Sequence, residues 1–244
     1  MNCRYFSLLL AVLLLAGCST KNPTPSADQY FQEGERFFDK HLYNDAISFW
    51  QKARDTYYSP ELGMLTELKI AEAYFVSERY EEAATAYADF LKQHPNDFRI
   101  ATVMYRLGLS YYKQILSADR DQTSTEKALQ TFLDFRKRFP DDKQGAEVDD
   151  LIQRCRNRLA DHEVYVGRFY LRMENYQSSI HRLAGALEKY PNYNHRDEVY
   201  FLLGKAYLKS GDKTKGVKAL EQLQKQFPDS DYLEDAQEIL SKEG

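Results

Sequence analysis

The chain has 244 residues, with 33 Lys and Arg against 37 Asp and Glu, so its formal net charge at pH 7 is −4. A nucleic-acid-binding protein needs a basic surface that neutralises phosphates, and this slightly acidic balance offers none. We therefore expect no nucleic-acid partner.

The N-terminus has the pattern of a secretory signal peptide. Arg4 precedes an apolar run over residues 8–15, which ends at Leu15-Ala16-Gly17-Cys18. The run is too short to cross a bilayer of about 30 Å as a helix. Its last four residues resemble the lipobox of bacterial lipoproteins, whose cysteine becomes the first mature residue and carries acyl groups. We predict a signal peptide over 1–17 and a lipid on Cys18 as the only non-protein group, with no other cofactor.

Residues 18–26 form a short tether between the predicted lipid and the folded body. Nine residues reach at most about 30 Å, so the body should lie close to the membrane. Ser19 follows the cysteine where many lipoproteins carry the Asp of inner-membrane retention. We expect a lipid anchor on the periplasmic face of the outer membrane. Only Cys155 then stays free, and we interpret it as a small buried hydrophobe on a helix rather than a disulfide partner.

A skeleton of small and large residues returns five times after the tether. In each unit a small residue is followed by a second small residue, and a large apolar residue stands four positions later on the same helical face. The small pairs are Gly34 and Ala46, Ala71 and Ala83, Gly108 and Ala128, Gly167 and Ser179, and Gly204 and Gly216; the large residues are Trp50, Tyr87, Phe132, Leu183 and Leu220. This recurrence predicts an all-α, tetratricopeptide-like helical repeat superhelix of about five helix pairs. Such arrays bind other molecules along extended surfaces.

The expected helices follow in chain order. Repeat one pairs a helix over 27–40 with one over 43–57, repeat two pairs 62–77 with 80–94, and repeat three begins near Arg99. Proline cannot continue a helix, so it stops the second helix of each later repeat. The stops are Pro95, Pro140, Pro191 and Pro228.

Two places break the register. From Gly108 to Ala128 the interval is 20 positions where 12 are expected, which places an insertion of eight residues at 117–124. After Pro140, apolar periodicity predicts one long helix from about Gly145 to Arg172. This helix should separate N-terminal repeats one to three (27–142) from C-terminal repeats four and five (143–244). The tail over 231–241 is predicted to be a capping helix.

These irregular segments resemble a known family. They read GLSYY at 108–112, DRDQT at 119–123, RNRLADHE at 156–163 and YVGRFYL at 165–171. They are similar to the BamD (YfiO- and ComL-like) outer-membrane lipoproteins of the β-barrel assembly machinery, the BAM complex. The resemblance implies a scaffold that promotes folding and insertion of outer-membrane proteins. Its partners would be a barrel-inserting, BamA-like subunit, other assembly lipoproteins and the sorting signals of unfolded barrel proteins.

The family motif in this chain comprises Asp119, Arg120, Asp121, Arg156, Arg158, His162 and Glu163. We expect the insertion to be a turn whose carboxylates and Arg120 pair with charges of the long helix, such as Arg156 and Arg158. The resemblance also implies that the C-terminal half docks the barrel-inserting subunit. Partner-docking candidates are Arg182 and His181, which stand where the family usually has Asn-Arg, although a solvated helix charge remains the alternative for Arg182.

First helices line the concave face of a tetratricopeptide array, and residues three or four apart on them share that face. We predict a channel there for an extended or strand-like peptide with an aromatic end. The candidates are Phe31, Glu35, Phe38, Leu68, Glu72, Phe75, Tyr105, Leu109 and Tyr112. The alternative is that such aromatics only pack between helices, and it stays open for Phe38, Phe75 and Tyr112.

Catalytic and metal-binding patterns are not indicated. The five histidines lack paired ligand spacing, and Asp119-x-Asp121 lacks the glycine of a calcium loop. We therefore predict a protein that is not an enzyme and holds no metal. Another cell-envelope tetratricopeptide lipoprotein, pilotin-like or a Tol-associated coordinator, is the alternative function. The first has no reason to carry the Asp-Arg-Asp insertion, and the second would more often place a coiled coil before the repeats.

Overall fold

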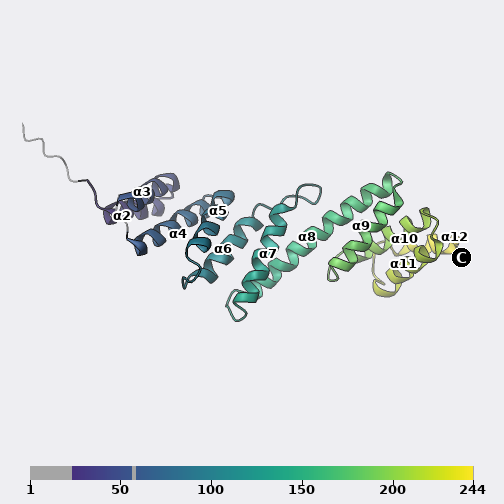
Figure 1. The fold of residues 1–244 in the computed structure, drawn as a ribbon. Helices are drawn as coiled ribbons and strands as arrows, with labels where there is room; N and C mark the ends of the chain where they lie inside the picture. Colours follow the sequence, from purple (N-terminus) through teal and green to yellow (C-terminus); the bar gives the residue numbers. More distant parts are fainter. Residues whose placement is uncertain (1–23, 57–58, 244) are drawn as a thin grey trace, which may run out of the picture. The chain divides into compact units, whose positions relative to one another are not determined.

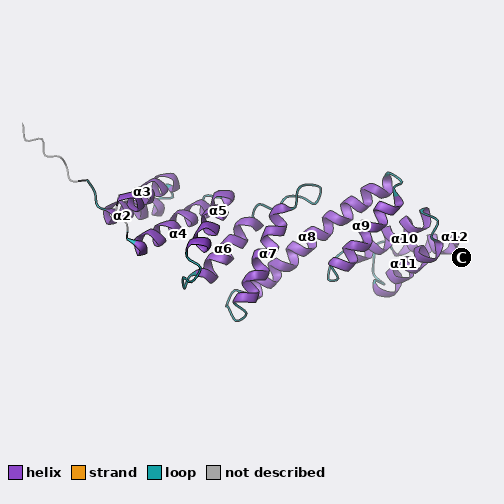
Figure 2. Ribbon diagram, in the orientation of Figure 1, coloured by secondary structure: helices purple, strands orange, loops and turns teal. Residues whose placement is uncertain are grey.

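The computed structural model describes residues 24–56 and 59–243, and their regular structure is entirely α-helical (Figures 1 and 2). This confirms the all-α class. The predicted signal peptide, Cys18 and most of the tether lie outside the described residues. The helices are α2 (Ala27–Asp39), α3 (Tyr43–Thr56), α4 (Pro60–Val76), α5 (Tyr80–Gln93), α6 (Ile100–Tyr112), α7 (Thr123–Arg138), α8 (Gly145–Arg172), α9 (Tyr176–Lys189), α10 (Arg196–Lys209), α11 (Lys213–Gln226) and α12 (Leu233–Glu243).

The helix bounds agree closely with the expected ones. The long helix α8 runs over the 28 residues that its apolar periodicity predicts. Helix α4 begins at Pro60, two residues earlier than expected, because proline fits the first turn of a helix, where its missing N–H is not needed. The predicted capping helix is α12, which begins two residues later than expected.

Contacts between residues divide the chain into two compact units, one ending at Thr66 and one beginning at Glu67. The first unit holds α2, α3 and the first turns of α4. The second holds the rest of α4 and all later helices, so residue 142 lies inside it. The predicted separation into N-terminal repeats (27–142) and C-terminal repeats (143–244) with different partners stays a prediction.

Each helix pair closes on a small residue, as the repeat pattern predicts. A Cβ atom added to Gly34 would overlap the Trp50 ring, and one added to Gly108 would overlap the Phe132 ring. The same relation joins Gly167 to Leu183 and Gly204 to Leu220. In the fourth pair, Ser179 Oγ also donates a hydrogen bond to the carbonyl oxygen of Gly167 at 2.8 Å. The recurring glycines therefore allow two helices to approach closely enough for one large side chain to fill the space between them.

The turn inside several helix pairs needs a left-handed residue. His41, Glu78 and Glu174 have φ angles of 59°, 61° and 58°. The corresponding turn of the fifth pair uses Gly211, with φ of 89°. Glycine adopts this conformation without a steric penalty, whereas the other three residues hold it under some strain.

Helix α8 belongs to two neighbouring cores of the second unit. Its N-terminal half packs on α7, where Val148, Ile152 and Cys155 join Phe132 and Phe135. Its C-terminal half packs on α9 and α10 through residues such as Val164. Figure 1 shows α7 and α9 along its two halves. Cys155 is fully buried, which confirms its interpretation as a small core residue, and burial raises the pKa of its thiol to about 12.

Candidate protein-binding surfaces

Glu72 of α4 lies at the centre of a polar cluster in the second unit. Its Oε2 accepts a hydrogen bond from the Tyr87 hydroxyl of α5 at 2.7 Å, and its Oε1 accepts one from Arg106 Nη2 of α6 at 3.0 Å. The Arg106 guanidinium lies 4.9 Å from the centroid of the Phe75 ring, which packs edge-on against Tyr80 at 5.5 Å. We call these five residues the Glu72 cluster. Two of the predicted channel residues, Glu72 and Phe75, therefore join α4 to α5 and α6.

Burial keeps the Tyr87 hydroxyl in the form that donates to Glu72. Loss of solvent contact and the nearby Glu72 carboxylate both raise the pKa of Tyr87 far above its ordinary value, while Arg106 opposes them weakly. The hydroxyl therefore stays protonated over the whole physiological pH range. Every polar group at the centre of the cluster has a partner from the chain itself.

The first unit holds three of the predicted channel residues. Phe38 lies 5.6 Å from the Trp50 ring and 5.4 Å from the Tyr43 ring, and Phe31 lies 6.5 Å from Trp50. Both are half-buried, as is Glu35. These contacts are the ones expected if the aromatic side chains pack between helices instead of lining a groove. A peptide can meet only the part of each side chain that remains accessible.

The α6 candidates differ in exposure. Tyr105 is buried beside Phe135, and burial, helped by a hydrogen bond with Glu147, raises its pKa to about 12. Tyr105 is therefore a core residue and does not line an open groove. Leu109 is half-buried against the same core, and Leu68 of α4 is half-buried as well. The nine candidates are therefore not equally available to a ligand, and a channel along all of them stays a prediction.

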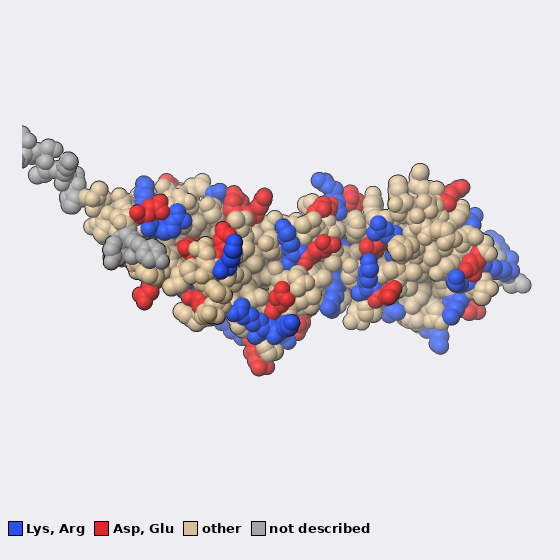
Figure 3. Space-filling view, viewed as in Figure 1, with Lys and Arg blue, Asp and Glu red and all other residues tan. Residues whose placement is uncertain are grey.

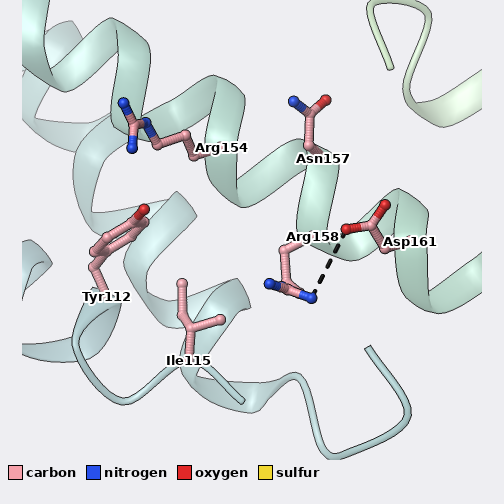
Figure 4. Close-up of a pocket in the computed structure, with 6 residues that line it drawn as sticks. All are labelled: Tyr112, Ile115, Arg154, Asn157, Arg158 and Asp161. Atoms are coloured by element: carbon pink, nitrogen blue, oxygen red, sulfur yellow. Dashed lines mark ion pairs between the residues drawn. The ribbon is translucent and has the colours of Figure 1, made fainter. Parts of the chain in front are cut away.

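Tyr112, the last channel candidate, borders a pocket of about 400 Å³ between the end of α6, the following loop and α8 (Figure 4). Its lining comprises Tyr112, Ile115, Arg154, Asn157, Arg158 and Asp161. Arg158 Nη1 is 3.8 Å from Asp161 Oδ2, which is an ion pair but too long for a hydrogen bond. Asp161 Oδ1 instead accepts a hydrogen bond from the Tyr193 hydroxyl at 2.6 Å. The pocket is thus polar on its α8 side, where Arg154 also interacts with the Tyr112 hydroxyl, and apolar along Ile115.

The insertion loop has partners other than those expected. Asp121 accepts hydrogen bonds from the backbone N–H of Thr123 at 3.0 Å and from its hydroxyl at 3.1 Å, and these bonds lower the pKa of Asp121. Hydrogen bonds with Ser117 and with its own backbone lower the pKa of Asp119. The expected pairing of this loop with Arg156 or Arg158 is therefore wrong. Short polar side chains beside the carboxylates satisfy them first.

The loop reaches α8 through a different member of the family motif. His162 Nδ1 lies 2.7 Å from the carbonyl oxygen of Ala118, and Gln122 Nε2 donates to two carbonyls inside the loop, those of Ser117 and Arg120. Because the carbonyl can only accept, His162 Nδ1 carries the proton in this contact. The motif residue His162 thus holds the inserted loop against α8, while Arg120 is exposed.

Glu163, the neighbour of His162, pairs with the predicted docking residue Arg182. Arg182 Nη1 of α9 donates to Glu163 Oε2 of α8 at 3.1 Å. The Glu163 side chain is 16% exposed and that of Arg182 is 41% exposed. Arg182 is therefore anchored by its own chain yet keeps part of its guanidinium at the surface. His181 is exposed beside it.

Arg156 lies at a second, smaller pocket between α8 and the turn from α9 to α10. This pocket has a volume of about 330 Å³ and includes Tyr190 and Asn192 of the turn. Gln153 Nε2 donates to the carbonyl oxygen of Asn192 at 3.0 Å and so joins α8 to the turn. Arg156 and Arg158 are thus two residues apart on α8 but line different pockets.

The sequence interpretation missed the residues that complete the first pocket. Arg154 and Asn157 stand four positions before Arg158 and Asp161, so each pair shares a helical face and could have been grouped by spacing. The bond between Tyr193 and Asp161 could not have been found in this way, because it depends on the path of the turn before α10.

Three general features bear on function. Among the residues that the structure describes, no group of His, Cys, Asp and Glu side chains is arranged to hold a metal ion. None of the described helices is long and apolar enough to span a bilayer. On the face seen in Figure 3, acidic and basic side chains are interspersed.

Comparison with known proteins identifies the family. Residues 23–215 match YfiO, a family described as an outer membrane lipoprotein. The chain belongs to the YfiO family. The matched range includes the Glu72 cluster, the insertion loop and all of α8, and it ends near the start of α11.

Relatives in this family carry a functional name. The chain is 29% identical to "Outer membrane protein assembly factor BamD" of Rickettsia prowazekii (strain Madrid E), over 93% of this chain and 92% of the relative. It is 24% identical to the protein of the same name from Caulobacter vibrioides, over 97% of this chain and 80% of the relative. The same name belongs to a relative from Neisseria meningitidis serogroup A, 22% identical over 91% and 90% of the two chains. The likeness therefore extends over nearly the whole length of the chain.

Proposed function

We propose that this chain is an outer-membrane lipoprotein scaffold that promotes folding and insertion of β-barrel proteins as part of a BAM-type assembly. The observation that carries the proposal is the YfiO family match over residues 23–215, joined to relatives named outer membrane protein assembly factors. The scaffold acts by binding protein partners and not by catalysis. A pilotin-like or Tol-associated role is not favoured, because these relatives carry the assembly-factor name.

The anchor is a lipid on Cys18 at the periplasmic face of the outer membrane. Support comes from the lipobox and from where the folded body starts. Ser26 caps α2: its Oγ accepts from the backbone N–H of Gln29 at 3.2 Å, and its own N–H donates to Gln29 Oε1 at 2.8 Å. This capping box begins the first helix directly after the tether, so only a few residues separate the lipid from the first repeat.

The two halves of the array have separate partners in this proposal. The N-terminal repeats receive sorting signals of unfolded barrel proteins, and the C-terminal repeats dock the barrel-inserting subunit. The accessible part of Arg182 supports a docking role, because its pairing with mostly buried Glu163 holds the guanidinium in a defined position. For the peptide channel, the half-buried aromatics Phe38, Phe75 and Tyr112 are candidates through the part of each side chain that stays accessible.

Affinity purification tests the proposed assembly. The tagged full chain is expected to recover an integral β-barrel protein and further lipoproteins from mild-detergent extracts of outer membranes. A second tagged outer-membrane lipoprotein, expressed at the same level, is the control for adhesion to membrane fragments. Recovery of the chain without any barrel protein would contradict the proposal. Mass spectrometry of the same sample tests the anchor separately, through acyl groups on Cys18.

A further inference from the structure

One face of α8 carries a row of side chains that stay at least partly exposed. Arg154, Arg158, Tyr165, Phe169 and Met173, the last at the helix end, recur at intervals of four or seven residues. Residues at these intervals lie above one another on one helical face. We call this row the α8 strip. It lies within the second unit and has a cationic end and an apolar end.

The apolar end is unusually exposed. Tyr165, Phe169 and Met173 are 42%, 44% and 64% exposed, whereas other apolar residues of α8, such as Val148 and Val164, are buried. A single exposed apolar side chain is ordinary, but three in a row on one helical face are typical of a surface that another protein covers. Their removal from water would contribute to binding and costs the fold nothing.

The cationic end opens into the 400 Å³ pocket, which Tyr112 and Ile115 close from the opposite side (Figure 4). Arg158 has no hydrogen-bond acceptor there among the described residues. Asp161 Oδ2 lies 3.8 Å from Arg158 Nη1, and Asp161 Oδ1 accepts a hydrogen bond from the Tyr193 hydroxyl. Arg154 is exposed and has two partners of its own, Asp150 at 2.7 Å and the Tyr112 hydroxyl, and solvent weakens the exposed pair with Asp150. A guanidinium with free donors in a partly enclosed pocket is suited to a carboxylate, which can accept two parallel hydrogen bonds.

We propose that the α8 strip binds an extended segment of a partner polypeptide, with an Asp or Glu side chain on Arg158 and a large apolar side chain on the row from Tyr165 to Met173. Arg158 and Phe169 are eleven residues apart, which corresponds to about 16 Å along a helix. An extended chain covers that length in about five residues. The segment therefore carries its acidic and apolar residues about five positions apart. The strip shares no residue with the predicted peptide channel, although Tyr112 of that channel lines the pocket at its cationic end. The strip does not include Arg182.

Fluorescence anisotropy with a designed probe tests this assignment. The protein is the full mature chain in lipid nanodiscs, which avoids free detergent on the apolar row. The probe is a labelled nine-residue peptide of Gly and Ser with one Glu and, five positions later, one Phe; its matched partner has Gln in place of Glu. The variants are Arg158→Gln and Phe169→Ala. Their matched controls are Arg120→Gln, in the exposed loop, and Phe98→Ala, which replaces a side chain that is 90% exposed outside the strip.

The expected result has two parts. Each strip variant weakens binding of the Glu probe by about tenfold, as loss of one central contact does, and both controls bind as the unmodified chain does. Arg158→Gln also removes the preference for Glu over Gln, whereas Phe169→Ala leaves this preference intact. That pattern shows that the Glu carboxylate of the probe contacts Arg158 and is not attracted only by the overall charge of the surface.

Three outcomes of the binding measurement would overturn the proposal. They are no binding of the Glu probe up to about 1 mM, equal weakening by the control variants, and equal affinity of the unmodified chain for the two probes. A contact of the strip with a second copy of the chain would instead show as concentration-dependent self-association that Phe169→Ala abolishes, and this too contradicts the assignment. Unchanged thermal midpoints establish that the variants are folded; Tyr165→Ser replaces Phe169→Ala if that variant is not. None of these outcomes changes the purification result that tests the assembly.

Discussion

The Glu72 cluster and the α8 strip contain the same kinds of residue in opposite situations. In the cluster, an arginine and aromatic side chains surround a carboxylate from the same chain, and each central polar group is hydrogen-bonded. In the strip, arginines and aromatic side chains follow one another along one helical face, while the carboxylate near Arg158 is held by Tyr193. The first arrangement joins helices, and the second leaves binding capacity at the surface. Residue type alone does not distinguish a structural contact from a binding surface; the partners do.

The largest effect is expected from comparing two phenylalanines. Phe132 fills the space above Gly108 and is fully buried, so Phe132→Ala should lower the free energy of unfolding by about 3–5 kcal/mol. Phe169→Ala, on the exposed strip, should change it by about 0.5 kcal/mol or less. Urea denaturation followed by circular dichroism measures both. Similar losses for the two variants would mean that the strip is part of the core.

Glu72→Ala should come next. It leaves the buried Tyr87 hydroxyl and Arg106 without their acceptor, which should lower the free energy of unfolding by about 2 kcal/mol. Arg158→Gln in the strip should lower it by no more than about 0.5 kcal/mol, because it breaks no hydrogen bond. Glu82→Ala is a matched control, since Glu82 pairs with Arg79 on an exposed surface. If Glu82→Ala cost as much as Glu72→Ala, the cluster would not be the tie between α4, α5 and α6.

A third comparison concerns Arg182, which is hydrogen-bonded within its own chain, as in the cluster, and partly exposed, as in the strip. Arg182→Gln should weaken co-purification with the barrel-inserting subunit about fivefold, because a positioned surface charge is lost. This variant is cleaner than Arg182→Glu, which would place a second carboxylate beside mostly buried Glu163. Lys189→Gln, which removes an exposed charge from the same helix, is the control. Equal recovery of the barrel-inserting subunit with the unmodified chain, Arg182→Gln and Lys189→Gln would place the docking surface elsewhere.

The smallest effect is expected at a turn outside both regions. Glu174 holds a left-handed φ of 58°, and the fifth repeat has Gly211, with φ of 89°, in the corresponding turn. Glu174→Gly should relieve this strain and raise the free energy of unfolding by about 0.5–1 kcal/mol. Thermal denaturation detects such a gain. A loss of stability would show that the Glu174 side chain contributes more than its backbone strain costs.

The helices and their pairing could be predicted because the signals are local. The pairing of Gly108 with Phe132 follows from the periodicity of small and large residues, even across an insertion, and the bounds of α8 follow from continuous apolar spacing. Side-chain partners across helices could not be predicted in the same way. The bond from Tyr193 to Asp161 depends on helix rotation and on the path of a turn.

The wrong prediction for the insertion loop has the same origin. Charge complementarity suggested pairs between its carboxylates and Arg156 or Arg158. Thr123, two positions further along the chain, satisfies Asp121 instead, and a hydrogen bond between His162 and the Ala118 carbonyl joins the loop to α8. Short-range hydrogen bonds form at little entropic cost, so they prevail over distant ion pairs. The pocket behind Tyr112 was likewise visible only once the loop and α8 had been placed together.

The central claim is that the chain serves the assembly of outer-membrane β-barrels. Its most direct test is depletion of the protein from growing cells, followed by measurement of newly made barrel proteins in the outer membrane by their heat-modifiable mobility on gels. We expect that folded barrel proteins fall while their unfolded forms accumulate, and that the unmodified chain, but not a Cys18→Ser variant, restores them at native expression levels. Undiminished folding of barrel proteins after depletion would show that the chain does not have this role.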